Sequence, residues 1–151
     1  MREPESRPLI LFLCTGNSCR SQMAEGWTRV LKGDEFEVVS AGTEPKPVDP
    51  RAVRAMAEAG VDISGQGAKS VDEFAGWEFD YVVTVCDAAY EACPFFPGKT
   101  KRVHAGFADP PKLAESAGSE EEALEHYRRI RDRIRAFVEA MPGSLEAEAL
   151  F

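Results

Sequence analysis

The stretch LFLCTGNSCRSQMAEG, residues 11–26, combines the pattern of a buried strand with a cysteine-containing loop and the start of a helix. It starts as a continuous apolar run, typical of a strand that is buried on both faces, and this run ends at Cys14. A polar turn with a glycine follows, and Arg20 arrives six residues after Cys14, where helix-like spacing begins. The sequence therefore places a thiol where a buried strand enters a loop that leads into a helix.

Outward from this stretch, strand and helix patterns alternate along the chain. Apolar runs rich in β-branched residues predict strands over 9–13, 36–40 and 81–85, and a weaker strand over 101–104. Apolar periodicity and capping residues predict helices over 21–31, 50–59 and 120–141, and a short helix over 71–74. This alternation predicts an α/β fold, in which a single domain holds a four-stranded parallel sheet with helices on both faces.

Length and composition fit one globular domain of 151 residues, 44% hydrophobic and 29% charged. We expect a flexible leader over 1–8, a single catalytic domain over 9–141 and a C-terminal tail over 142–151. A formal net charge of −8 disfavours nucleic acid and anionic membranes as partners. No apolar run approaches the roughly 20 residues that a membrane span needs. Since the first residues also lack the apolar core of a signal peptide, we expect a cytoplasmic protein.

The loop after Cys14 has the chemistry of an oxyanion site. A short loop that enters a helix can turn successive backbone N–H groups inward, and the positive end of the helix dipole adds to their effect. Arg20 can bind two oxygens of a tetrahedral anion, while the same field favours a thiolate at Cys14. A cysteine that ends a strand by chance also fits the motif, but the strand before it and the helix after it favour a catalytic loop. The expected oxyanion-binding residues are Thr15, Gly16, Asn17, Ser18, Cys19, Arg20 and Ser21. The thiol of Cys19 itself is expected to pack as a small apolar group.

Two further cysteines, Cys86 and Cys93, lie far from the loop in sequence. The spacings of the four cysteines are wrong for a structural zinc site, and we expect no bound metal and no bound cofactor. Cys86 follows the strand predicted over 81–85, so it faces the same crevice as Cys14 if the two strands are neighbours. Cysteines seven apart lie about 10.5 Å apart along a helix, whereas a disulfide needs Cα atoms within about 7 Å. A disulfide between Cys86 and Cys93 therefore requires any helix between them to unwind.

The loop CTGNSCRS resembles the catalytic loop of the low-molecular-weight protein tyrosine phosphatase family. SAGT after the second strand and DPP at 109–111 extend this resemblance over nearly the whole chain. Members of the family either hydrolyse phosphotyrosine or reduce arsenate with electrons from thioredoxin. The segment VVTVCDAAYEACP is similar to the redox segment of the arsenate reductases, and the loop sequence CTGNSCRSQMAEG is similar to the corresponding loop of these reductases. Gln22 and Lys112 depart from the phosphatase pattern, and the resemblance therefore favours a reductase.

The resemblance implies a relay of three cysteines. Cys14 would attack arsenate, Asp109 would protonate the departing oxygen, Cys86 would displace arsenite, and Cys93 would move the disulfide away for thioredoxin to reduce. Asp109 is otherwise a turn-forming Asp-Pro residue. We expect a monomer whose loop also binds phosphate or sulfate. The alternatives are a phosphotyrosine phosphatase that uses Cys14 and Asp109, and a non-enzymatic oxyanion-binding or redox-sensing module.

Some reductases of the family bind potassium beside the catalytic loop. The matching positions here are Asn17, Glu25 and Ser40, and a gapless alignment puts Lys69 where a fourth, acidic ligand is expected. A lysine ammonium in that place would hold Glu25 directly. We therefore expect little dependence on potassium.

Overall fold

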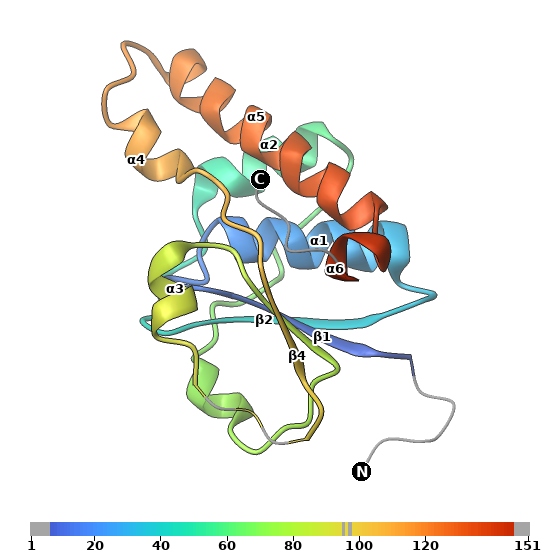
Figure 1. Cartoon of the computed structure of the whole chain (residues 1–151). Helices are drawn as coiled ribbons and strands as arrows, with labels where there is room; N and C mark the ends of the chain where they lie inside the picture. Colours follow the sequence, from blue (N-terminus) through green and yellow to red (C-terminus); the bar gives the residue numbers. More distant parts are fainter. Residues whose placement is uncertain (1–6, 95, 97, 147–151) are drawn as a thin grey trace.

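The computed structural model describes residues 7–94, 96 and 98–146 (Figure 1). Its strands are β1 (Leu9–Cys14), β2 (Glu37–Gly42), β3 (Tyr81–Thr84) and β4 (Lys101–His104). They form one four-stranded sheet in the order β2-β1-β3-β4, and every neighbouring pair is parallel. The predicted α/β fold with a four-stranded parallel sheet is confirmed.

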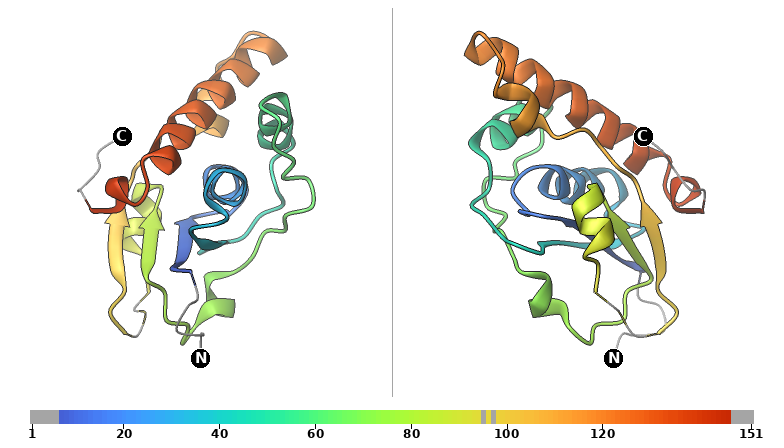
Figure 2. Two further views of the ribbon diagram at one scale, coloured as in Figure 1. Left: turned by 90° about the vertical axis from the view of Figure 1, so that its right-hand side faces the viewer. Right: turned by 60° about the vertical axis from the view of Figure 1, so that its left-hand side comes forward.

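Helices cover the sheet on both sides. They are α1 (Arg20–Lys32), α2 (Pro50–Glu58), the 3-10 helix η1 (Val71–Phe74), α3 (Asp87–Glu91), α4 (Pro110–Ala114), α5 (Glu120–Glu139) and α6 (Gly143–Glu146). Helices α1, α2 and α5 lie together above the sheet in Figure 1, and the two views of Figure 2 place α3 on the side opposite α1. Helix α5 buries the predicted apolar stripe, which is Ala123, Leu124, Tyr127, Ile130, Ile134, Phe137 and Val138.

Strand β1 occupies the centre of the core. All of its residues are buried, because β2 and β3 pair with its two edges while helices cover its faces. The register pairs Leu13 with Thr84, so the chain leaves β1 and β3 at the same edge of the sheet. Cys14 and Cys86 therefore lie at the same carboxyl edge, as expected if their strands are neighbours.

Parts of both predicted ends contact the domain. The tail predicted over 142–151 includes α6, in which Ser144 and Leu145 are buried. In the predicted leader over 1–8, the described part is anchored, since Arg7 donates to the Gly33 carbonyl and lies 3.5 Å from Glu37. Residues 1–6 and 147–151 lie outside the described part of the chain. Among the described helices, none is long and apolar enough to cross a membrane.

Candidate active site

Cys14 is the last residue of β1, and its side chain is buried at the base of the loop that leads into α1. The Ser21 hydroxyl lies 2.9 Å from the Cys14 sulfur, and the backbone N–H of Asn17 donates to it at 3.2 Å. Both are hydrogen bonds that a thiolate accepts. The thiol is thus held in one orientation at the floor of the loop, as a nucleophile requires.

The loop carbonyls explain how its N–H groups come to point inward. From Cys14 to Ser18, every backbone carbonyl accepts a hydrogen bond from the surrounding structure. The donors are the backbone N–H groups of Thr43, Glu44, Lys46 and Asp49 and the side-chain amide of Gln22. Because a trans peptide points its N–H away from its C=O, these outward bonds turn the N–H groups toward the inside of the loop. Within the described residues, the N–H groups of Gly16, Ser18 and Cys19 have no protein acceptor, which suits an oxyanion cradle.

Asn17 joins the loop to its support. Its φ of +50° lies in the left-handed region, which asparagine tolerates better than most residues. Its side-chain amide donates to the hydroxyls of Ser21 and Ser40, each at 2.9 Å, and its side-chain oxygen accepts the N–H of Lys69 at 2.8 Å. The fully buried Asn17 therefore fixes the loop, the start of α1 and β2 relative to one another.

The sequence indicates no structural role for Gly42 and Gln22, two residues that position the loop. A Cβ on Gly42, at the end of β2, would lie 2.5 Å from the Thr15 carbonyl oxygen and 2.9 Å from the Asn17 nitrogen, so only glycine fits there. Gln22 is fully buried and its amide donates to both oxygens of Asn17 and to the Gly67 carbonyl. A glycine at the end of a strand was a usable signal for Gly42, whereas no local pattern marks Gln22 as buried.

Arg20 and Asp109 meet at the mouth of the loop. Arg20 donates to the Phe107 carbonyl at 2.8 Å, and its guanidinium lies 3.7 Å from the Asp109 carboxylate. Asp109 precedes the first turn of the short helix α4. Its side chain is 42% exposed. The structure thus brings together the two groups predicted to bind the anion and to protonate its departing oxygen.

Cys86 lies next to the same loop. Its side chain is buried, and its sulfur lies 3.4 Å from the Thr15 hydroxyl and accepts the N–H of Ala89 at 3.4 Å. Cys86 and Cys93 are both free thiols, and α3 separates them. Cys93 is half-buried, and burial raises the pKa of its thiol, against an opposing effect of the nearby Arg102. Helix α3 thus lies between Cys86, which caps its first turn, and Cys93, which is two residues beyond its last residue.

Cys19 differs from the other loop residues. Its thiol is buried, and burial raises its pKa well above the ordinary value, with the Asp49 carboxylate adding to the effect. A thiol that stays neutral in this way is a poor nucleophile. Its backbone N–H faces the loop, while its side chain belongs to the core, as predicted.

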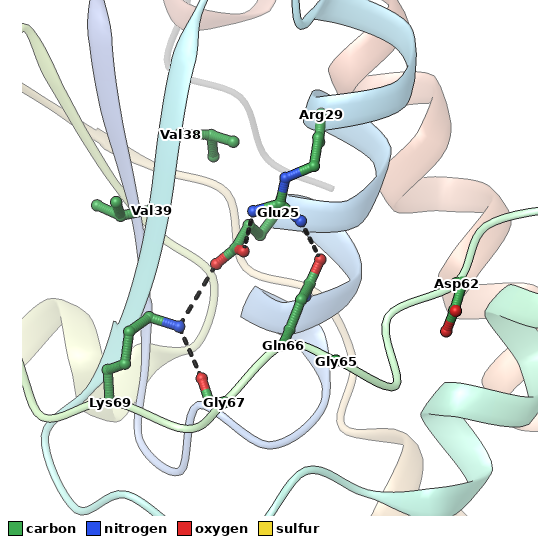
Figure 3. A pocket seen from close by; sticks show the side chains of 9 residues that line it. All are labelled: Glu25, Arg29, Val38, Val39, Asp62, Gly65, Gln66, Gly67 and Lys69. Carbon is green, nitrogen blue, oxygen red and sulfur yellow. Dashed lines mark hydrogen bonds and ion pairs between the residues drawn. The ribbon is translucent and has the colours of Figure 1, made fainter.

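A polar network lies behind the loop, around the buried carboxylate of Glu25 (Figure 3). Glu25 accepts from the Ser40 hydroxyl at 2.6 Å, pairs with Arg29 and lies 3.6 Å from the Lys69 ammonium. Lys69 also donates to the Gly67 carbonyl at 2.6 Å. The ammonium thus makes the direct contact with Glu25 expected from the sequence. Among the described residues, no group of three or more His, Cys, Asp or Glu side chains is arranged to hold a metal ion.

The chain is thus an α/β protein in which a buried cysteine and a loop of inward-facing N–H groups lie at the carboxyl edge of a parallel sheet. Residues 9–149 match the low molecular weight phosphotyrosine protein phosphatase family, and the chain belongs to that family.

Several similar proteins carry the name of a different activity. An arsenate reductase of Halalkalibacterium halodurans is 48% identical over 138 residues, which are 89% of this chain and 97% of that protein. An arsenate reductase structure in the phosphate-binding state matches with a TM-score of 0.68 and 29% identity, covering 89% of this chain and 95% of the other. A thioredoxin-dependent arsenate reductase of Corynebacterium glutamicum matches with a TM-score of 0.64 and 28% identity, covering 94% of this chain and 65% of the other.

Proposed function

We propose that this protein reduces arsenate to arsenite through a covalent adduct on Cys14 and a disulfide relay through Cys86 and Cys93, with thioredoxin as the electron donor. One observation carries the proposal. A second buried thiol, Cys86, lies against Thr15 of the oxyanion loop, and α3 separates it from a third, Cys93. A hydrolase of this family needs only the first of these thiols, whereas a reductase needs all three.

The reaction begins with binding of the oxyanion. The inward N–H groups of the loop and the Arg20 guanidinium neutralise the charge of arsenate, and a phosphate or sulfate ion of the same shape competes for this site. The Cys14 thiolate attacks arsenic and forms a sulfur–arsenic bond. Asp109 gives a proton to the departing oxygen, which leaves as water.

The reduction itself is a thiol exchange. The Cys86 thiolate attacks the Cys14 sulfur, a disulfide forms, and the electron pair of the sulfur–arsenic bond passes to arsenic, which leaves as arsenite. The contact between Thr15 and Cys86 supports this step, because it keeps the second sulfur beside the loop that holds the first.

Regeneration moves the disulfide outward. The Cys93 thiolate attacks Cys86, Cys14 leaves as a thiolate, and α3 unwinds because a regular helix keeps residues 86 and 93 too far apart. The dithiol of thioredoxin then reduces the disulfide between Cys86 and Cys93. Such exchange needs a reducing compartment, and we therefore propose a cytoplasmic, monomeric enzyme.

The test is arsenite formation from arsenate with thioredoxin, thioredoxin reductase and NADPH. We expect one NADPH consumed and one arsenite formed per turnover, and no turnover when thioredoxin is omitted. An aryl phosphate is the control substrate. Hydrolysis of the aryl phosphate without arsenate-dependent NADPH consumption would show a phosphatase instead, and a protein that binds phosphate but does neither would be an oxyanion-binding module.

The phosphatase alternative has one observation in its favour. The proximity of Arg20 and Asp109, 3.7 Å apart, also suits a phosphomonoester hydrolase, in which Arg20 would bind the phosphoryl oxygens and a protonated Asp109 would give its proton to the leaving alcohol. A low phosphatase activity is therefore compatible with the proposed reductase.

A further inference from the structure

Two side chains of β4 reach toward α3, the helix between Cys86 and Cys93. Arg102 and His104 are alternate residues of β4, so they lie on the same face of the sheet, while Val103 between them is buried in the core. Helix α3 lies beside β3 and β4 (Figure 2, right). The two side chains contact opposite ends of this helix.

His104 holds the first residue of α3. One ring nitrogen lies 2.8 Å from the Thr84 hydroxyl, and the other lies 3.0 Å from the Asp87 carboxylate. The bond to Thr84, on the neighbouring strand β3, fixes the orientation of the imidazole ring. The ring in turn anchors Asp87, whose own side chain is 91% exposed and has little other support.

Tyr90 connects the two β4 side chains. Its ring centroid lies 4.7 Å from that of His104, and the guanidinium carbon of Arg102 lies 5.9 Å from the Tyr90 ring centroid. Arg102 also donates to the Tyr90 carbonyl at 3.4 Å, one of the carbonyls that the end of a helix leaves without an intrahelical partner. We call Asp87, Tyr90, Arg102 and His104 the β4 clasp.

Apart from the clasp, α3 is held by the bond from the Ala89 N–H to the Cys86 sulfur and by the burial of Ala89. It spans five residues, Asp87–Glu91, and only Ala89 among them is buried. A helix this short does not persist by its own propensity and depends on tertiary contacts. The clasp supplies those contacts at both ends of α3.

We propose that the β4 clasp positions α3 in the dithiol enzyme and opens when Cys93 attacks Cys86, so that it makes the Cys86–Cys93 disulfide easier for thioredoxin to reduce. The proposal rests on the relay proposed above. Unwinding of residues 87–91 moves Asp87 and Tyr90 away from β4, and the clasp is lost in the disulfide form. A contact present in one state alone shifts the equilibrium toward that state.

The electron balance gives the direction of the effect. Reduced thioredoxin gives two electrons and two protons to the Cys86–Cys93 disulfide, and thioredoxin leaves as its own disulfide. When α3 then refolds, the clasp forms and favours the products. The clasp thus raises the reduction potential of the couple, just as stabilisation of any reduced form does.

The positive charge of Arg102 also favours the dithiol form of the couple. Burial raises the pKa of Cys93 and the positive charge of Arg102 opposes this rise, so the guanidinium lies close enough to act on the sulfur. Arg102 therefore acts both on the end of α3 and on the thiol of Cys93, which lies two residues beyond that helix.

The test is the reduction potential of the Cys86–Cys93 couple, measured in redox buffers against thioredoxin in full-length protein with Cys14→Ser. Tyr90→Ala removes both ring contacts. We expect its equilibrium with thioredoxin to shift about tenfold toward the disulfide, which is about 30 mV more negative. Tyr90→Phe keeps the ring and should retain the parent potential. Glu91→Ala, on the same helix but outside the clasp, is the matched control and should also retain it.

Helix propensity alone predicts a change in reduction potential of the opposite sign, so the measurement distinguishes the two explanations. Alanine favours a helix more than tyrosine does, so a helix held by propensity alone would become more stable in Tyr90→Ala and its potential would rise. An unchanged or higher reduction potential in Tyr90→Ala would refute the proposed effect of the clasp. Arg102→Gln, at an exposed position, provides a second variant in which a smaller shift in the same direction is expected.

The same experiment separates the clasp from the proposed function. If no Cys86–Cys93 disulfide forms in the Cys14→Ser parent at any redox poise, the relay is wrong and the clasp has no couple to act on. If the disulfide forms with one potential in all variants, the relay stands and the clasp is refuted.

Discussion

Replacing Cys93 with serine should convert the enzyme from many turnovers to one. The change leaves Cys14, the oxyanion loop and Asp109 intact, so arsenate should still be attacked and Cys86 should still release arsenite once. The resulting disulfide joins Cys14 and Cys86, whose side chains are only 4% and 6% exposed. Thioredoxin reaches such a buried disulfide poorly.

The magnitude follows from the chain itself. Each chain has one Cys14 and one Cys86, so the burst should be one arsenite per enzyme molecule. In the wild type, Cys93 is seven residues from Cys86 and presents its thiol at an effective concentration in the millimolar range. In Cys93→Ser, thioredoxin must attack in place of Cys93, and its micromolar concentration is about 1000-fold below the effective concentration of the Cys93 thiol. Steady turnover should therefore fall by about that factor or more.

The assay is rapid-quench measurement of arsenite at enzyme concentrations high enough to resolve the burst, followed by peptide mapping of the arrested enzyme. The map should show Cys14 joined to Cys86. The matched control is Ala92→Ser, which adds the same hydroxyl at the neighbouring exposed position and should turn over normally. Aryl phosphate hydrolysis by reduced Cys93→Ser should persist. Repeated turnover of arsenate by Cys93→Ser with thioredoxin would refute the relay.

Three further changes test the support of the site. Gly42→Ala places a Cβ 2.5 Å from the Thr15 carbonyl oxygen, and the resulting displacement of the loop should lower kcat/KM about 100-fold. Gly65→Ala, where a Cβ meets open space, is the control and should keep the wild-type kcat/KM. Equal activities of the two variants would contradict the close approach at Gly42. Exchange of sodium for potassium should leave the thermal stability and turnover of the wild type unchanged, because the Lys69 ammonium already contacts Glu25. Lys69→Met should make both properties depend on potassium. A several-fold response of the wild type to potassium would contradict this role of Lys69. Cys19→Ser should retain turnover but lose about 1–3 kcal/mol of unfolding free energy in urea titrations, since it buries a hydroxyl where a neutral thiol packs; a dead but stable variant would assign Cys19 a chemical role.

The sequence predicts the fold well where periodicity and capping are local properties. The buried run before Cys14 and the stripe on α5 can each be read from apolar spacing alone, and Asp49 with Pro50 marks the start of α2. The short helices α4 and α6 are different. Five or four residues give no period to detect, and the burial of Leu145 depends on contacts with distant segments.

The candidate site divides in the same way. The loop from Cys14 to Ser21 can be recognised in the sequence because its residue types are unusual after a buried strand. What holds the loop in place is non-local: its carbonyls bond to the segment after β2, and Gln22 bonds across to Gly67. Such partners are 20 or more residues away in the chain, and no short pattern identifies them. The β4 clasp was missed for the same reason, and His104 was assigned no function from the sequence.

The structure also suggests how little separates a reductase from a phosphatase in this family. The loop, Arg20 and Asp109 bind and attack a tetrahedral oxyanion in either case, and their support by Asn17 and Gly42 has no bearing on which anion reacts. Reduction adds a sulfur within reach of the adduct and a second sulfur that can carry the disulfide away. Because β3 ends beside β1, a cysteine two residues after β3 meets the first need, and a short, weakly held helix after it meets the second. The marginal stability of α3 is then part of the chemistry: a longer helix would trap Cys93 at a distance, and an unanchored segment would leave the disulfide too stable for thioredoxin to reduce.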